Sequence, residues 1–407
     1  TLSQCKKDDS TGGNSPAPAD SSGIGDTTQN PEFNPTPYAF DRATIVQSIP
    51  SFGSVDNTPD DNPTTEEGAE LGRYLFYDVR LSENRTISCA SCHKQQHAFS
   101  DSRKISRGLF GEQTNRHSMA LFNMQFSGSF NWDGSSETLE EQMLEPIRDP
   151  IEMHMTPEEV AGRLRDIERY PPMFAAAFGS EEINPERISF ALAQFCRTLV
   201  SYNSEYDQAY RQYPDMLNNY DTAQYRQLYQ AQKAQGATGM LTPKEYYGLE
   251  LFRIHPDYTD QLNPVRGADC MHCHENASGL FTTNTTLLNE FANNGLQSEF
   301  PEDKGREEVT GKRSDRGKFK IPTLRNIGFT APYMHDGRFE TLAEVIEHYD
   351  QHVQPGPHQN DHMVTTGNVR PGKLDLTEKE KEALLAFLKT LNDTSFTEKS
   401  EFSNPFD

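Results

Sequence analysis

Along this chain the apolar residues recur mainly at helical spacing, and the strict alternation that is typical of strands is scarce. Four helices are predicted, at residues 63–76, 186–199, 242–251 and 377–391. Threonines stand at three of these starts, and acidic residues follow within one turn, as Glu380 follows Thr377. The pattern therefore favours a mainly α fold.

Two stretches lack a clear apolar stripe. Residues 6–37 are rich in Asp, Ser, Thr, Gly, Asn and Pro, so we expect a disordered tail over residues 1–37, with order beginning near Tyr38. Residues 203–235 are polar, rich in Tyr and Gln, and free of glycine. They are expected to form a helical insertion or connector rather than a domain of their own.

The charge of the chain excludes several classes of partner. Its 407 residues carry a formal net charge of −23. A surface this acidic repels phosphate groups, which argues against nucleic acid and against an anionic membrane surface. The sequence also has no apolar run of about 18 residues, the length that a membrane-spanning helix needs.

Four of the six cysteines form two Cys-x-x-Cys-His motifs, at residues 89–93 and 270–274. The motif residues are Cys89, Cys92, His93, Cys270, Cys273 and His274. This motif attaches c-type haem: the two thiols bind the haem covalently and the imidazole becomes the proximal iron ligand. Zinc or a dithiol redox site are the alternatives, but the two pairs lie far apart for a four-cysteine zinc site. Cys196 lies beside an apolar helix face and is expected to be a buried structural thiol.

Together these features predict a mainly α protein of two cytochrome c-like domains, each with one covalently attached c-type haem. Residues 38–235 would form the N-terminal haem domain, including the insertion at 203–235. Residues 236–407 would form the C-terminal haem domain.

Several ordered segments resemble the bacterial dihaem cytochrome c peroxidases and their MauG-like relatives. The resemblance covers about residues 62–395, apart from 203–235. The segments are LGRYLFYD at 71–78, CASCH at 89–93, NWDG at 131–134, LEEQMLEPIRDPIEM at 139–153, CMHCH at 270–274, and FKIPTLRNIGFTAPYMHDGRFETLAEVIEHYD at 319–350.

The resemblance implies roles for residues around the first haem. Trp132 would lie between the two haems and relay electrons, although a plain core indole is the alternative. Gln142, Pro146 and Glu152 would form the distal pocket of the first haem. Glu152 would move a proton between the two peroxide oxygens, work that suits a carboxylate whose pKa is raised by partial burial. Without the resemblance, a solvated loop carboxylate would be the simpler interpretation.

The resemblance also implies the sixth ligand of the second haem iron. In the family this ligand follows the histidine of a PY-x-H-DG segment, here His335, by fourteen residues, which is Tyr349. Ordinary peroxidases of the family have methionine at this position, and MauG-like enzymes have tyrosine. A phenolate favours ferric and higher states, whereas a thioether favours ferrous iron. Met334 and His348 are the rival ligands: Met334 is out of register, and His348 should point about 100° away on a helix.

The chain departs from ordinary members of the family at two places. Phe110 or its neighbours stand where those peroxidases have a distal histidine, which suggests an open first haem iron. His117 stands where the family has an asparagine that helps to bind calcium between the haems. Imidazole is a poor ligand for this hard cation. The carbonyl groups of Thr330 and Pro332, which complete that calcium site, are present.

The function implied is hydrogen-peroxide-dependent oxidation of Trp or Tyr residues on a partner protein through a pair of high-valent haems. One alternative is a cytochrome c peroxidase that reduces hydrogen peroxide with electrons from a small cytochrome or cupredoxin. A second is a non-catalytic dihaem electron-transfer cytochrome. Covalent haem implies the periplasmic side of a bacterial envelope. Cys5 resembles the lipidated cysteine of a lipoprotein, which favours a lipid anchor there, and an unmodified thiol on a trimmed tail is the alternative.

Overall fold

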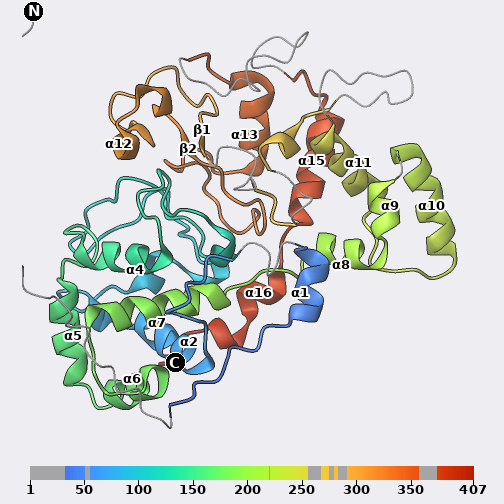
Figure 1. The fold of residues 1–407 in the computed structure, drawn as a ribbon. Coiled ribbons are helices and arrows are strands. Elements are labelled where there is room, and N and C mark those ends of the chain that lie inside the picture. The colour runs from blue at the N-terminus through green and yellow to red at the C-terminus, as the bar shows by residue number, and fades with distance from the viewer. Residues whose placement is uncertain are drawn as a thin grey trace, which may run out of the picture.

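The computed structural model describes residues 33–50, 56–219, 221–254, 267–274, 279–282, 291–356 and 374–407. Within these ranges the fold is mostly helical, as predicted (Figure 1). The α-helices are α1 (Arg42–Ser48), α2 (Glu66–Tyr77), α3 (Cys89–Cys92), α4 (Leu139–Arg148), α5 (Pro157–Arg165), α6 (Tyr170–Phe178), α7 (Pro185–Thr198), α8 (Glu205–Gln212), α9 (Pro214–Asn218), α10 (Thr222–Ala234), α11 (Pro243–Arg253), α12 (Glu307–Thr310), α13 (Leu342–Glu347), α15 (Glu378–Lys389) and α16 (Thr394–Glu398). The strands β1 (Phe291–Ala292) and β2 (Phe319–Lys320) form a short antiparallel pair.

The four predicted helices correspond to α2, α7, α11 and α15, with ends displaced by one to three residues. Each begins where a side chain satisfies a free backbone N–H group of the first turn. The hydroxyl of Thr65 accepts from the N–H of Gly68 at 3.0 Å, and the hydroxyl of Thr377 accepts from the N–H of Glu380 at 3.4 Å. These local caps explain why the starts could be predicted from sequence.

The first hydrophobic core is built around the crossing of α2 and α7. The two backbones approach closely at Gly72, where an added Cβ atom would lie 1.9 Å from the carbonyl oxygen of Ala191. Cys89 of the first Cys-x-x-Cys-His motif packs against this core. Cys196 is fully buried within it, as expected for a structural thiol.

The second core repeats this arrangement with α11 and α15. Here the close approach is at Gly248, where an added Cβ atom would lie 2.0 Å from the carbonyl oxygen of Ala383. Cys270 of the second motif packs against this core. The two halves therefore share one plan, in which a glycine-containing helix crosses a later helix beside a Cys-x-x-Cys-His segment.

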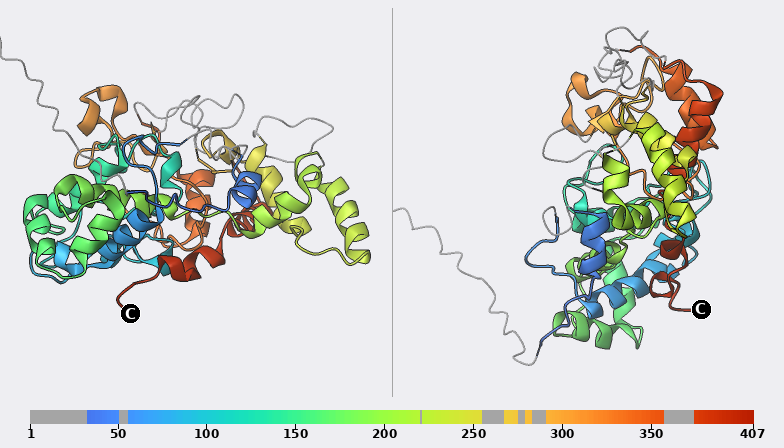
Figure 2. Two further views of the ribbon diagram at one scale, coloured as in Figure 1. Left: turned by 60° about the horizontal axis from the view of Figure 1, so that its bottom comes forward. Right: turned by 90° about the vertical axis from the view of Figure 1, so that its right-hand side faces the viewer.

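The segment 203–235 forms α8, α9 and α10, and its buried hydrophobic residues belong to the second core. Tyr225 of α10 stacks on Tyr246 of α11 with ring centroids 3.7 Å apart and planes almost parallel. Figures 1 and 2 show α10 beside α11 at one end of the molecule, with α5 and α6 at the other end. We therefore propose a domain boundary before α8 rather than the predicted one at residue 235.

Both ends of the described chain pack on the first half. Thr36 donates from its backbone N–H to Glu67 of α2 at 2.9 Å, so the chain contacts the fold two residues before the predicted start of order. Phe396 of α16 and Phe402 return to the first core after α15 has completed the second. Cys5 and residues 1–32 lie outside the described residues. Within the part that the structure describes, no helix is long and apolar enough to cross a bilayer.

Candidate functional site

The first Cys-x-x-Cys-His motif forms the short helix α3 and the residue after it. The ring Nδ1 of His93 lies 2.9 Å from the carbonyl oxygen of Phe99. A proton on Nδ1 satisfies this carbonyl and leaves Nε2 with a free lone pair, the arrangement that a metal-binding histidine needs. Burial lowers the pKa of His93 and raises that of Cys92 to about 11, so the imidazole is neutral. Both thiols of the motif are free of disulfides.

The second motif has the same arrangement. Its first three residues form a single 3₁₀ turn, Cys270–His272. The Nδ1 of His274 lies 3.1 Å from the carbonyl oxygen of Pro322, and the backbone of Phe281 also contacts the ring. A proton on Nδ1 would again leave the lone pair of Nε2 for a metal. Burial lowers the pKa of His274 to about 4 and raises that of Cys273 to about 11. Because the two motifs belong to different cores, their four thiols do not form one zinc site.

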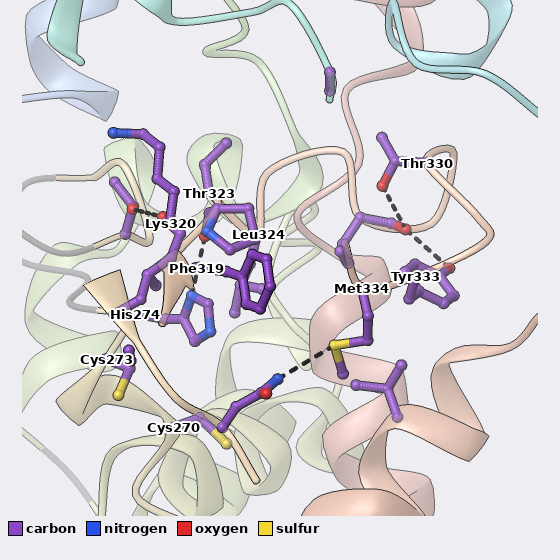
Figure 3. A pocket seen from close by; sticks show the side chains of 18 of the residues that line it. Cys270, Cys273, His274, Phe319, Lys320, Thr323, Leu324, Thr330, Tyr333 and Met334 are labelled. Carbon is purple, nitrogen blue, oxygen red and sulfur yellow. Dashed lines mark hydrogen bonds between the residues drawn. The ribbon is translucent and has the colours of Figure 1, made fainter. Parts of the chain in front are cut away.

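A cavity of about 370 Å³ lies beside the second motif. Its wall includes all three motif residues together with apolar side chains, among them Phe252, Leu280, Ile346, Leu384 and Leu388. In Figure 3, Cys270, Cys273 and His274 lie on one side of this cavity and Met334 lies across from them. Two free thiols, a neutral imidazole with a free nitrogen and an apolar enclosure fit a c-type haem.

Tyr349 and Met334 both line this cavity. Tyr349 lies in a π-helical turn, His348–His352, that directly follows α13. Its hydroxyl lies 3.2 Å from the side-chain amide nitrogen of Asn294, and burial raises its pKa to about 12. The same amide nitrogen lies 3.4 Å from the sulfur of Met334. The Nε2 of His348 lies instead 3.1 Å from the backbone carbonyl oxygen of Asn294, and His348 is not among the described residues that line the cavity.

Trp132 lies where the two halves meet at the cavity. Its indole Nε1 donates to the carbonyl oxygen of His117 at 2.7 Å, and its carbonyl oxygen accepts from the N–H of Lys320 at 2.7 Å. Its ring lies 6.4 Å from that of His335, in an edge-to-face arrangement. The indole is therefore held between residues of the first and the second half, and its role as a relay stays a prediction.

The predicted distal residues of the first haem lie on α4 and the loop that follows. Gln142 accepts from the hydroxyl of Ser136 at 2.9 Å. Pro146 lies inside α4, and its carbonyl oxygen accepts from the N–H of Met153 at 3.1 Å, which folds the loop back beside the helix. Burial, aided by the charges of Asp149 and Glu145, raises the pKa of Glu152 to about 7.

Glu152 lies near the first haem-attachment motif. After burial, its negative charge is among the causes that raise the pKa values of the Cys89 and Cys92 thiols. The structure therefore brings the Glu152 carboxylate to the same site as the two thiols, although Glu152 lies sixty residues after Cys92 in the sequence. A half-buried carboxyl group with a pKa near 7 can both accept and return a proton at neutral pH.

Phe110 lies at the tip of a loop beside the Glu152 segment. The N–H of Leu109 donates to the carbonyl oxygen of Ile151 at 2.8 Å, which joins the two loops. The Phe110 side chain is 63% exposed and so faces solvent. A phenyl ring supplies no iron ligand wherever it lies, so the open first iron stays a prediction.

His117 is buried and its ring is surrounded by backbone carbonyl groups. Its Nδ1 lies 3.1 Å from the carbonyl oxygen of Arg103 and 3.2 Å from that of Lys104, and its Nε2 lies 3.1 Å from the hydroxyl of Ser100. Thr330 also contributes a backbone contact to this ring. The imidazole thus donates to oxygens of the kind that a calcium ion would need. This contact argues against the calcium ion predicted at Thr330 and Pro332, which chelation would test.

Asn294 is the residue of this site that sequence reasoning missed. It stands in a polar stretch shortly after β1, with no motif around it. Its contacts with Met334 and Tyr349 span 40 and 55 residues. No local signal could have identified it, because only the tertiary fold brings these three side chains together.

Comparisons with known proteins agree on one family. The family model for di-haem cytochrome c peroxidase matches residues 66–215. The chain is 31% identical over 334 residues to the methylamine utilization protein MauG of Methylorubrum extorquens, covering 82% of this chain and 80% of that protein. It is 30% identical over 329 residues to a cytochrome c551 peroxidase of Nitrosomonas europaea, covering 81% of each. Among solved structures, a MauG-like protein associated with microbial copper homeostasis is 34% identical, with a TM-score of 0.67 over 93% of this chain and 98% of that one.

Proposed function

Because this chain belongs to the family of dihaem cytochrome c peroxidases and MauG proteins, we propose that it uses hydrogen peroxide to oxidise Trp or Tyr residues of a partner protein. It is a haem-dependent oxidoreductase with two covalently bound c-type haems, which supply the reaction with peroxide and the transfer of electrons. The protein's own residues hold these haems and handle protons. The oxidation of Trp or Tyr residues on a partner protein, rather than another activity of the family, is our proposal.

The observation that carries this proposal is the place of Tyr349. Its hydroxyl lies in the cavity beside Cys270, Cys273 and His274, within hydrogen-bond distance of Asn294. A phenolate ligand stabilises ferric and more oxidised iron, since it is a hard anionic donor. A second haem held by His274 and Tyr349 would therefore retain oxidising equivalents rather than collect electrons.

The first site would handle the proton of the peroxide reaction. Glu152 is buried enough to have a pKa of about 7, so it can take a proton from one peroxide oxygen and return it to the other. Gln142 and Pro146 both lie in α4, and the carbonyl oxygen of Pro146 accepts from the N–H of Met153, the residue after Glu152, so we assign them to the same distal pocket. We assign Trp132 to the path between the two sites, since it contacts residues of both halves.

A peroxidase that takes electrons from a small cytochrome or cupredoxin is the second candidate. Met334 favours it, because its sulfur lies in the same cavity and contacts the same amide as Tyr349. A thioether ligand raises the reduction potential of haem iron and makes the haem a better electron acceptor.

Spectra of the diferric holoprotein before and after one equivalent of hydrogen peroxide test the proposal. Electron paramagnetic resonance should show one high-spin and one low-spin haem, and peroxide should give an oxidised form that persists for minutes. Reduced small c-type cytochrome should be consumed slowly. Two low-spin haems that react only after one is reduced, with fast consumption of the cytochrome, would establish the second candidate. Haems inert in both states would leave only electron transfer.

We also propose that the protein acts on the periplasmic side of a bacterial envelope, with a lipid anchor at Cys5. Covalent attachment of c-type haem takes place there in bacteria, and the motifs at both sites require it. Mass spectrometry of the protein purified from membranes tests the anchor: a diacylated Cys5 peptide is expected, and an unmodified thiol would contradict it.

A further inference from the structure

Asn294 contacts two different candidate ligands of one iron. Its amide nitrogen lies 3.2 Å from the oxygen of Tyr349 and 3.4 Å from the sulfur of Met334. Both donor atoms are thus within reach of a single nitrogen, on the wall of the cavity that contains His274. Two side chains able to bind iron are available where a haem held by His274 needs only one further ligand.

The surroundings hold Asn294 and Tyr349 firmly but leave Met334 adaptable. The backbone carbonyl oxygen of Asn294 accepts from the ring of His348, which fixes the amide relative to the neighbouring Tyr349. Met334 begins a tight turn in which the N–H of Gly337 donates to its carbonyl oxygen at 3.1 Å. Its backbone φ angle is +76°, a value that residues other than glycine seldom adopt. The side chain beyond has three rotatable bonds and adapts readily to its surroundings.

The two donors prefer different oxidation states of iron. A phenolate is a hard anion and binds ferric iron better, whereas a thioether is soft and binds ferrous iron better. The amide of Asn294 can donate to either atom, so the donor that is not bound to iron still keeps a hydrogen-bond partner. The energetic difference between the two arrangements is then set mainly by the charge on the iron.

We propose that Tyr349 and Met334 are alternative ligands of the second haem iron, with Tyr349 bound in the ferric protein and Met334 in the ferrous protein. On addition of one electron from a reduced small c-type cytochrome, the Tyr349 oxygen would leave the iron and take a proton from water, which releases hydroxide, and the Met334 sulfur would bind the iron instead. Oxidation of the haem by hydrogen peroxide would reverse each change. Asn294 is a positioning residue that holds both donors at the iron.

This inference rests on the proposed function, because it takes Tyr349 as the ligand of the oxidised protein. It also extends that function: one chain would stabilise oxidised iron through Tyr349 and would keep an added electron on ferrous iron through Met334. These are the behaviours that separate the two candidate functions.

Ligand assignment in both oxidation states of the holoprotein tests the inference. Electron paramagnetic resonance of the ferric form and magnetic circular dichroism of the dithionite-reduced form should be recorded for Met334→Leu, with Met240→Leu as the matched control. Met240 packs in the second core, so its loss removes a buried thioether of the same half. Met334→Leu should leave the ferric spectra unchanged and abolish the ferrous low-spin signal of the second haem, whereas Met240→Leu should change neither.

The outcomes are separable. If Met334→Leu leaves both oxidation states unchanged, Met334 is not a ligand and the inference fails, while the proposed function stands. If Met334→Leu changes the ferric spectrum and Tyr349→Phe does not, Met334 is the ligand throughout, and the proposed function fails with the inference.

The role of Asn294 is tested by reduction potential. Asn294→Leu removes the shared donor and should shift the potential of the second haem and slow the exchange of ligands after rapid reduction. Asn294→Gln keeps an amide and should restore part of both effects. A merely structural role would alter the melting temperature without moving the potential, and that result would overturn the positioning role.

Discussion

The reaction with peroxide should depend on the ionisation of Glu152. Its pKa is raised from 4.5 to about 7 because the group is buried and the carboxylates of Asp149 and Glu145 lie nearby. If the ionised form takes the proton from peroxide, the rate follows the ionised fraction. That fraction is about one tenth near pH 6 and about nine tenths near pH 8, so the rate constant should rise about tenfold between them.

Two substitutions separate the origin of this dependence. Glu152→Gln keeps the shape of the side chain and removes the base, so the rate constant should fall by about 10²–10⁴ and lose its dependence on pH in this range. Asp149→Asn keeps an oxygen that accepts from the N–H groups of Ile151 and Glu152 but removes a charge that raises the pKa. The profile of this variant should move to lower pH, with the high-pH rate retained.

Stopped-flow absorbance of the diferric protein mixed with excess peroxide measures these rate constants. The contribution of Glu152 to the stability of the fold decreases with rising pH, whereas the rate constant is expected to increase. An increase in rate caused by better folding can therefore be distinguished. A carboxyl group whose pKa is raised on folding stabilises the fold fully below its unfolded pKa, and this contribution is lost as the pH rises to about 7. A rate that rises over the same range is therefore not a consequence of better folding. Glu152→Gln with an unchanged rate and an unchanged pH profile would refute the reasoning.

Three further predictions concern stability and calcium. Gly248→Ala should destabilise the protein by about 1–3 kcal/mol, since the new methyl group would collide with the backbone of α15. In Gly162→Ala of α5 the methyl group meets only the guanidinium of Arg165, 4.0 Å away, and this variant should be more stable by about 0.5–1 kcal/mol. Thermal unfolding measures both, and equal effects would contradict the close approach at Gly248. Arg325→Met should lower the free energy of unfolding by about 3–5 kcal/mol, because it leaves the buried carboxylate of Asp207, which Arg325 contacts at 2.7 Å, without its charged partner. Chemical denaturation measures this change, and a loss below about 1 kcal/mol would show that the pair is dispensable. Chelation with EGTA should leave the spectra and the melting temperature unchanged, since His117 already donates to the carbonyl oxygens near Thr330, and a lower melting temperature would instead establish the calcium site.

Local chemistry made part of this protein predictable from sequence. Helices α2, α7, α11 and α15 were predictable because a cap and an apolar stripe lie within a few turns of one another. The haem-attachment motifs were predictable for the same reason, since two thiols and an imidazole within five consecutive residues are recognised without any tertiary information. The family followed from ordered motifs, and the comparisons confirmed it.

Other features depend on contacts between distant parts of the chain, which sequence spacing does not reveal. The polarity of residues 203–235 suggested an insertion, yet a few buried side chains such as Tyr225 join this segment to the second core. The pKa of Glu152 is set by how deeply its loop is buried, which depends on the packing of α4 and its neighbours.

Asn294 shows most clearly what only the tertiary structure decided. This polar side chain stands in a polar stretch of sequence. It lies at the site because β1 pairs with β2 and because the ring of His348 contacts the backbone of Asn294. Sequence could name Tyr349 and Met334 as rivals, since each is a known kind of iron ligand. Only the fold places both within reach of one amide, because that proximity is a property of packing over 40 and 55 residues rather than of either residue's own surroundings.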